Sequence, residues 1–466
     1  MPQLAPTGHT STPPHDGRAP ARPGAALTVT AAATAVALMN YTAPMLTLPD
    51  TAAAFGTPPS AQAWLLNGTP LGLAVLLLVA GSLADAHGRR RIFLLGTLAL
   101  GLTTALGALA DSTLTFTAAR VAQGAASAAV LAGSLGLLAH AYPAGRDRIR
   151  ATGIWGASVS AGIALGPLLA GALSLADWRL VYGTLGAASL VIAGAGARAL
   201  KADGTKREGS GSRPDIAGAT ALGLALAALL TALTLGRDGW LRPQVGLLLF
   251  AAVALTALFV AVERRSRTPM VDLALLRRPA FLASTLGALF TGLAVIGLFS
   301  VVPALLQGGA GMSPLGAAWL FVLWSGTAFV VALQARRLPA RLSAPYQLAL
   351  GFALSAAGVL ALLGGLEGPT ASWSRLLPGL LVAGAGSGLL NAALPRLAVD
   401  SVPPERAAMG SGANNTARYI GSSAGVALML ALATAGTGPD TAVVVSAALA
   451  VTGAVVTLAL GRRPRR

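Results

Sequence analysis

The sequence is poor in the residues on which soluble enzymes and extracellular domains depend. Its 466 residues include no cysteine, so it has neither a disulfide framework nor a thiolate metal site. Only 11% of the residues are charged, against roughly 25% in an ordinary soluble domain. Lys201 and Lys206 are the only lysines, and no G-x-x-x-x-G-K-[ST] string occurs, which excludes an ATP-driven pump on this chain alone. The four histidines are scattered, so no metal or other cofactor is expected.

What replaces the missing charge is apolar sequence. The chain is 55% hydrophobic and contains 57 glycines, which are commoner in membrane helices than in soluble ones. A bilayer span needs about 20 apolar residues. We therefore expect an all-α integral membrane protein with fourteen spans, at about 25–48, 62–84, 92–110, 115–141, 151–175, 180–200, 215–235, 243–262, 280–306, 315–334, 345–366, 376–398, 407–433 and 440–460.

The distribution of basic residues predicts the orientation. The net charge of +17 is not gathered on one face, as nucleic-acid binding requires, but recurs in small clusters between apolar runs. Cytoplasmic loops are enriched in Lys and Arg. Most basic residues fall in every second loop and in the C-terminal tail, so both termini are expected in the cytoplasm, with the chain in the cell membrane. The loops on the other side hold few: Arg179, Arg237, Arg242 and Arg375.

The stretch 81–92, GSLADAHGRRRI, combines an acid, two glycines and three arginines between two apolar runs. The residues that match a known signature are Gly81, Leu83, Asp85, Gly88, Arg89 and Arg90. This loop resembles the signature of the major facilitator superfamily of secondary transporters, although Ala86 stands where that family has an arginine. Over nearly the whole chain the sequence resembles the fourteen-span drug:proton antiporters of the superfamily.

The resemblance implies two six-helix bundles with an extra helix pair between them, rocking around a midplane cavity. The expected segments are 1–24 (a disordered cytoplasmic tail), 25–200 (the N-terminal bundle), 201–279 (two extra spans with flanking cytoplasmic segments), 280–461 (the C-terminal bundle) and 462–466 (a basic tail).

In the family, the acid at Asp85 faces a helix N-terminus of the other bundle and closes the cytoplasmic side. Its expected partner here is the start of span 13, near 407–410, with Arg89 and Arg90 completing the contact. Gly81 and Gly88 are expected to let the backbones approach and turn. The alternative is a solvated loop acid.

Arg120 falls inside span 4, where a charge is costly and faces a cavity or a partner. The run from Arg120 through Gln123 resembles the fourth-helix motif linked to proton transfer in the superfamily. The alternative is that Arg120 extends to the outer surface, because Asp111 and Ser112 are close in sequence.

Span 5 carries small residues and one proline at the spacing of the antiporter helix motif, which marks exporters in the superfamily. These residues are Gly153, Gly162, Gly166, Pro167 and Gly171, with Ala170 in place of a glycine. Small residues permit close helix contact, and the proline bends the helix.

Span 1 has Asn40 and Pro44 at the spacing of the first-helix motif of the fourteen-span exporters, but Ala35 stands where that motif has an aspartate. No acid lies well inside an expected span. The expected substrate is therefore a small hydrophobic neutral or anionic molecule, since a desolvated cation needs a carboxylate or an aromatic cage. Proton coupling would run through a boundary acid, through the substrate's own ionisation, or not at all.

Span 13 contains Asn414, Asn415 and Arg418, in a region that resembles the same exporters. Either they serve the proton or substrate pathway, or the asparagines make helix–helix hydrogen bonds. Trp319, Trp324 and Gln307 are weaker candidates for lining the site, since tryptophans near span ends also anchor helices at the membrane surface.

No paired acids and no His–Ser arrangement recur near one span end, so the chain is not expected to be an enzyme. The predicted function is proton-coupled export of hydrophobic drugs, antibiotics or metabolites by a monomer in the lipid bilayer. The alternatives are an uncoupled facilitator for lipids or metabolites and a membrane sensor that does not transport.

Overall fold

The computed structural model describes residues 23–461, apart from 60, 143–145, 201–215, 237–238, 240, 267–274, 276, 336–341, 369–372, 403–406 and 435–437. The first half consists of α1 (Pro23–Thr42), α2 (Pro44–Phe55), α3 (Gln62–His87), α4 (Arg89–Ala108), α5 (Thr113–Ala141), α6 (Arg146–Leu173) and α7 (Trp178–Ala199). After α8 (Ile216–Gly236) and α9 (Pro243–Arg265), the second half consists of α10 (Pro279–Phe290), the π-helix η2 (Thr291–Ile296), α11 (Gly297–Gly309), α12 (Pro314–Ala335), α13 (Ala344–Leu360), α14 (Trp373–Asp400), α15 (Ala407–Thr434) and α16 (Pro439–Gly461).

The helices are those of a polytopic membrane protein. Within the described residues, eleven helical stretches are long and apolar enough to cross a bilayer, and α10, η2 and α11 form one of them. That count is three below the expected fourteen. The shorter apolar stretches Gln62–Leu77, Thr220–Leu229 and Ala344–Leu360 lie in α3, α8 and α13.

Two expected boundaries are wrong. The first apolar run is not one helix, because α1 ends at Thr42 and α2 starts at Pro44. The expected loop 85–91 is almost absent, since α3 runs to His87 and α4 starts at Arg89. Gly88 alone makes the turn, with a φ of +97° that residues with a Cβ rarely adopt.

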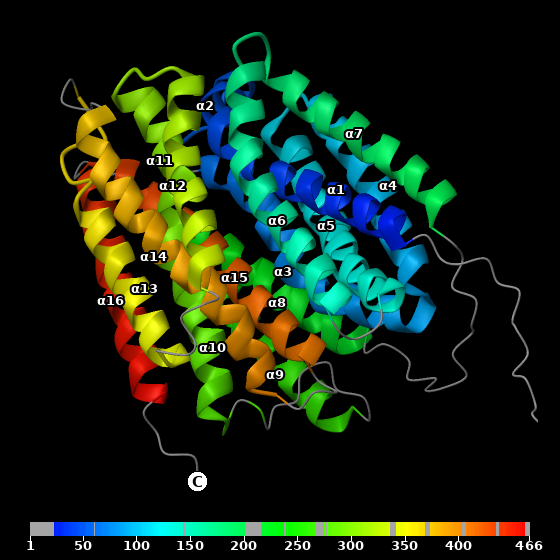
Figure 1. Ribbon diagram of the computed structural model, residues 1–466. Helices are drawn as coiled ribbons and strands as arrows, with labels where there is room; N and C mark the ends of the chain where they lie inside the picture. The colour runs from blue at the N-terminus through cyan, green and yellow to red at the C-terminus, as the bar shows by residue number, and fades with distance from the viewer. Residues whose placement is uncertain are drawn as a thin grey trace, which may run out of the picture.

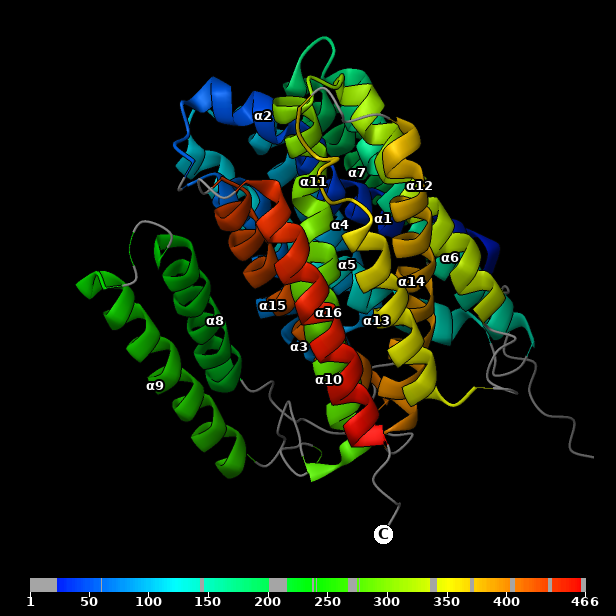
Figure 2. The same ribbon diagram turned by 90° about the vertical axis from the view of Figure 1, so that its left-hand side faces the viewer.

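Two bundles and a separate pair are visible in the figures. The N-terminal bundle packs α1, α3, α4, α5, α6 and α7 together, and the C-terminal bundle packs α10 to α16. They lean together at the top of Figure 1, near α2 and α11, and diverge below. Figure 2 shows α8 and α9 as a pair at one side, with α8 packed on α3 and α15 and α9 on its outer side.

Glycines set the closest helix contacts in the N-terminal bundle. A Cβ added to Gly124 of α5 would lie 2.2 Å from the carbonyl oxygen of Thr69, and one on Gly72 of α3 would lie 2.1 Å from that of Val121. Since a membrane interior supplies no hydrophobic force between helices, such close packing is the main attraction between α3 and α5. This contact positions Arg120, which lies on α5 between these glycines and the outer end of the helix.

The C-terminal bundle repeats the device on another helix pair. Gly292 of η2 and Gly421 of α15 each face backbone atoms of the opposite helix, with a Cβ of either only 2.1 Å from a carbonyl oxygen. The π-helix leaves backbone groups out of α-helical register, and Ser446 Oγ of α16 donates to the carbonyl of Ala294 at 3.1 Å. The π segment therefore lies directly against the part of α15 that carries Arg418.

Because α3 and α5 are in close contact, we expect replacement of a glycine at their interface to destabilise the protein more than replacement of a glycine elsewhere. Gly124→Ala should destabilise the protein by about 1–3 kcal/mol, because backbone rather than a flexible side chain meets the new methyl group. Gly156→Ala on α6 is the matched control, since its Cβ would meet nothing within 4 Å. The measurement is the thermal unfolding midpoint of the purified protein, and equal midpoints for the two variants would contradict this packing.

Candidate functional site

Arg120 is the most deeply buried charge in the described part of the chain. Its side chain is 0% exposed and reaches inward from α5 instead of extending to the outer surface. Nη2 donates to the carbonyl oxygen of Asn40 at 2.7 Å, and Nη1 donates to Oε1 of Gln123. Both expected pathway residues, Asn40 and Gln123, are thus brought to Arg120.

The break between α1 and α2 explains why Asn40 can receive this bond. In a continuous helix the Asn40 carbonyl would accept from the N–H four residues later, but that residue is Pro44, which has none. Arg120 supplies the missing donor. The proline that ends α1 therefore creates the acceptor that holds the guanidinium.

The remaining neighbours of Arg120 are uncharged. Gln123 Nε2 donates to the carbonyl of Thr103 at 3.1 Å, and Thr104 Oγ1 donates to Asn40 Oδ1 at 3.3 Å. The Tyr182 ring lies 5.7 Å from the Arg120 guanidinium carbon. Among the described contacts of Arg120, dipoles and an aromatic face replace a carboxylate. Ala35, the position of the expected family acid, lies elsewhere, with its carbonyl against Gly162 of α6.

A second guanidinium, Arg418 on α15, lies on the other side of the boundary between the bundles. Nη1 donates to Asn391 Oδ1 of α14 at 3.2 Å. Nε and Nη2 are buried and have no hydrogen-bond partner among the residues that the structure describes. Both Arg120 and Arg418 are close enough to Tyr41 to act electrostatically on its hydroxyl group.

Tyr41 joins the two bundles between these arginines. Its hydroxyl lies 2.9 Å from Ser422 Oγ, and its ring meets that of Tyr419 edge-on with centroids 5.8 Å apart. A second polar bond between the bundles lies nearer the outer end, where Gln307 Nε2 donates to the carbonyl of Leu46 at 3.2 Å. The site thus comprises one arginine from each bundle and a breakable hydroxyl pair between them.

A polar track leads from Arg120 toward the end of the N-terminal bundle where α2 lies. The Tyr182 hydroxyl lies 2.8 Å from Thr47 Oγ1 on α2, and Asp50 follows one helical turn later on the same face. Burial raises the pKa of the Asp50 carboxyl above its ordinary value, and the Asp177 carboxylate adds to the rise. Asp50 Oδ2 is buried without a hydrogen-bond partner among the described residues. A boundary acid with a raised pKa is therefore placed at the end of this track.

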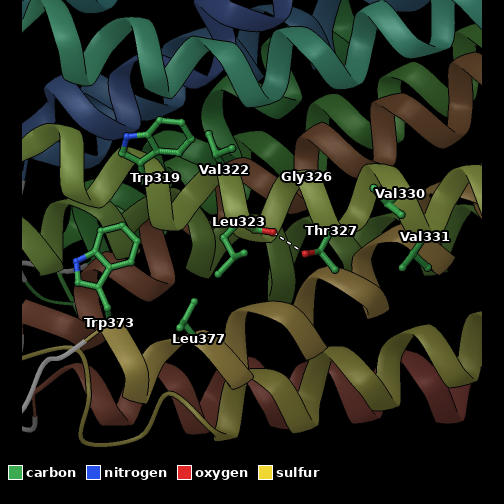
Figure 3. Close-up of a pocket in the computed structure, with 9 residues that line it drawn as sticks. All are labelled: Trp319, Val322, Leu323, Gly326, Thr327, Val330, Val331, Trp373 and Leu377. Carbon is green, nitrogen blue, oxygen red and sulfur yellow. Dashed lines mark hydrogen bonds between the residues drawn. The ribbon is translucent and has the colours of Figure 1, made fainter.

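Two hollows lie away from the arginines. One, of about 710 Å³, runs along α12 and α14, with Trp319 and Trp373 at one end and Val330 at the other (Figure 3). Figure 3 draws one hydrogen bond between the lining residues, in which Thr327 Oγ1 donates to the Leu323 carbonyl within α12. The other, of about 530 Å³, lies at the outer end between α2 and α11. Trp324 does not line the first hollow, because it stacks on Phe299 at 4.3 Å.

The expected gating residues are only partly described. Nothing can be placed at the Asp85 side chain or at most of its expected partner segment 407–410, which lie outside the described side chains. Arg90 donates to the carbonyls of Leu200 (2.8 Å) and Ala197 (3.0 Å), and Arg89 donates to that of Gly136 at 3.2 Å. These bonds stay inside the N-terminal bundle. A Cβ on Gly81 would meet nothing within 4 Å, so no close approach requires this glycine.

The span-5 motif lies along α6 and contacts both bundles. Gly162 and Gly166 pack against α1, where their Cβ positions would lie 2.4 Å from the Ala35 carbonyl and 2.2 Å from Thr42 Oγ1. Gly171, one turn past Pro167, instead faces Ala318 and the Pro314 carbonyl of α12. This helix thus links the Asn40 segment to the other bundle.

The two asparagines of span 13 make helix contacts. Asn414 Nδ2 donates to both the carbonyl and Oγ of Ser284 on α10, each at 3.0 Å. Asn415 Nδ2 donates to Ser411 of its own helix at 3.1 Å. The Asn414 bonds follow the helix–helix alternative, the Asn415 bond stays within α15, and Arg418 is the member of this group that reaches the site.

Sequence reasoning missed Tyr41, Tyr182 and Ser422. Five tyrosines occur in the whole chain, and Tyr41 adjoins Asn40, which is a usable signal. No local pattern indicated that Tyr182 and Ser422 would meet α1 or α2, because these contacts span 135 and 381 residues.

A double-mutant cycle tests the uncharged setting of Arg120. Gln123→Glu places a carboxylate on the Nη1 contact, so it should be tolerated beside Arg120 and be strongly destabilising in an Arg120→Met background. A lone buried carboxylate that loses its cation costs about 3–5 kcal/mol. The thermal midpoints of the four proteins give the coupling, and additive effects would show that the two side chains do not pair.

Comparisons with known proteins agree with this arrangement. The sequence profile of the Major Facilitator Superfamily matches residues 30–426. Multidrug resistance protein Stp of Mycobacterium tuberculosis is 31% identical over 82% of this chain and 70% of its own length. Puromycin resistance protein pur8 of Streptomyces alboniger is 32% identical over 88% of this chain and 82% of its own.

The probable actinorhodin transporter of Streptomyces coelicolor is 32% identical over 88% of this chain and 72% of its own length. The fold matches the crystal structure of a bacterial homologue of the human lysosomal transporter Spinster, in an inward-facing and unoccupied conformation. That match has a TM-score of 0.68 at 16% identity, covering 94% of this chain and 97% of the other. The chain therefore belongs to the Major Facilitator Superfamily and is a membrane transporter, not an enzyme.

Proposed function

We propose that this transporter exports small hydrophobic drugs, antibiotics or metabolites of neutral or negative charge, by alternating access coupled to proton entry. The observation that carries the proposal is the pair of buried guanidiniums, one in each bundle, with Tyr41 between them. A cargo that binds between these two arginines touches both bundles, so its binding can bias their relative position.

Outward direction is supported by α6 and by the relatives. The span-5 motif that marks exporters in the superfamily here joins α1 to α12, which suits a helix that transmits bundle movement. Relatives named for multidrug resistance, puromycin resistance and actinorhodin transport are 31–32% identical to this chain over the aligned residues.

The proposed membrane topology is fourteen spans with both termini in the cytoplasm. It counts α1 with the start of α2, to about residue 48, as one span, α10 with η2 and α11 as another, and each remaining helix once. The bundles then occupy 25–200 and 280–461, with α8 and α9 as the extra pair. Asp85, with Arg89 and Arg90, remains the proposed closing contact of the cytoplasmic side.

Proton coupling is proposed to start at Asp50. This acid lies on α2, which crosses the top of the molecule in Figure 2 and follows the candidate span Pro23–Thr42. Thr47, on the same face of α2 as Asp50, is hydrogen-bonded to the Tyr182 hydroxyl, and the Tyr182 ring lies next to the Arg120 guanidinium. The buried acid Glu263 lies in the last turn of α9, away from this track.

Three anthracene derivatives of one size test the charge preference. Anthracene-9-carboxylate, its carboxamide and 9-(aminomethyl)anthracene carry negative, zero and positive charge at neutral pH. In proteoliposomes, the transporter should transport the carboxylate and the carboxamide in response to a pH gradient but should not transport the ammonium compound. Robust gradient-driven movement of the ammonium compound would contradict the substrate class, and equal movement without a gradient would favour an uncoupled facilitator.

The raised pKa of Asp50 predicts a pH profile with a definite sign. An acid with a raised pKa stays protonated to higher pH, so gradient-driven transport should fall as the outer pH rises through that pKa. Asp177→Asn removes the like charge but keeps a capping side chain, and it should shift the fall to lower pH.

Asp50→Asn should abolish this pH dependence. Asp111→Asn is the matched control, because Asp111 is an exposed acid at the same end of the N-terminal bundle. A profile unchanged by Asp50→Asn would remove Asp50 from the proton route.

A further inference from the structure

The two buried arginines differ in the donors that they have left. Arg120 donates from Nη1 to Gln123 and from Nη2 to the Asn40 carbonyl, both within the N-terminal bundle, which leaves only its Nε without a described partner. In Arg418 only Nη1 donates a hydrogen bond, to Asn391 Oδ1. Its Nε and Nη2 are both buried and unpartnered, and these two nitrogens form one edge of the guanidinium.

That edge has a definite chemical complement. The N–H bonds of Nε and Nη2 point in parallel, which matches the two oxygens of a carboxylate in a bidentate pair. A buried cationic donor pair without an acceptor is costly, so a protein retains one where an acceptor arrives from outside. A neutral amide or ester oxygen occupies only one of the two donors.

The surroundings of this edge suit an aromatic or aliphatic body behind the acid group. Arg418 is half-buried and its Nη1 reaches the exposed Asn391, so one side of the guanidinium lies at an accessible surface. The Tyr41 and Tyr419 rings stand next to it, and the Tyr41–Ser422 pair offers two hydroxyl donors once it opens.

We propose that Arg418 is the anion-recognition residue, and that it binds lipophilic monoanions with two coplanar oxygens, such as carboxylates, through Nε and Nη2. Arg120 is a positioning residue that holds the α1 break in place. The assignment rests on the proposed function for its transport context, but binding alone tests it. If Arg418 is the anion-recognition residue, the preference of the transporter for anionic over neutral cargo is set by this side chain on α15.

The test measures equilibrium binding of anthracene-9-carboxylate and its carboxamide to the purified full-length protein by fluorescence. The wild type should prefer the carboxylate. Arg418→Gln should weaken carboxylate binding about ten- to hundredfold and leave carboxamide binding nearly unchanged, because bonds to charged groups are worth more than neutral ones. The carboxylate affinity of Arg418→Lys should lie between those of the wild type and Arg418→Gln, since an ammonium group keeps the positive charge but loses the two parallel N–H donors of the guanidinium.

Arg396→Gln is the matched control. Arg396 is another half-buried arginine of the C-terminal bundle whose Nη2 donates to a side-chain amide, Gln347 Oε1, at 3.2 Å. Its replacement should leave the preference intact. An equal loss in both glutamine variants would assign the effect to bundle stability and overturn the proposal.

The remaining outcomes separate this inference from the proposed function. A wild type that binds the two probes equally, or does not bind the carboxylate, overturns the role of Arg418 even if transport is found. Carboxylate binding that depends on Arg418 without any transport supports the site and refutes export. If Arg418→Gln does not fold, the Arg418→Lys protein decides, because an unchanged preference there contradicts the bidentate contact.

Discussion

The hydrogen bond from Arg120 to the Asn40 carbonyl is the contact on which the functional half of the structure depends. A fully buried guanidinium carries a desolvation penalty of about several kcal/mol, and here the described partners supply only dipoles and a ring to offset it. The acceptor exists because Pro44 cannot donate to it. A backbone irregularity of α1 and a side chain of α5 thus stabilise each other, and neither is favourable alone.

Close glycine contacts make that pairing possible. Gly72 and Gly124 bring α3 and α5 to backbone contact beside Arg120, and Gly292 and Gly421 do the same for η2 and α15 beside Arg418. The two bundles therefore use one packing device to hold one buried cation each. Among the described residues, they differ in that the N-terminal cation leaves only Nε without a partner, whereas the C-terminal one leaves the whole Nε–Nη2 edge without one.

This asymmetry suits a carrier whose cargo arrives and leaves. A fixed cation next to a broken helix keeps the N-terminal half in one shape, while the free edge on α15 waits for an acceptor. The bonds that join the halves here, Tyr41 with Ser422 and Gln307 with the Leu46 carbonyl, are neutral and single. Single neutral hydrogen bonds contribute about 1 kcal/mol each, so the halves can separate without a large barrier from these contacts.

The sequence by itself determined the class of protein, its family and the identity of both buried arginines. Those conclusions depend on features that are local: apolar runs long enough for a bilayer, the pattern at 81–92, and a charge too costly to sit in a span without purpose. It also found Asn40 and Gln123, because they lie in motifs with recognisable spacing. It identified Gly88 as a turn residue but misjudged the length of the loop 85–91 and the continuity of the first apolar run, where a single glycine or proline decides whether a helix continues.

Only the tertiary structure decided which faces of these helices meet. Membrane helices that are apolar on most sides carry little periodic signal of their buried face, so rotation about the helix axis is set by distant glycine contacts. That is why Tyr182 and Ser422 joined the site unforeseen, why Asn414 turned toward Ser284, and why Arg418 kept two donors free. The chemistry of each side chain was present in the sequence, but its partner was fixed by packing between segments up to 381 residues apart.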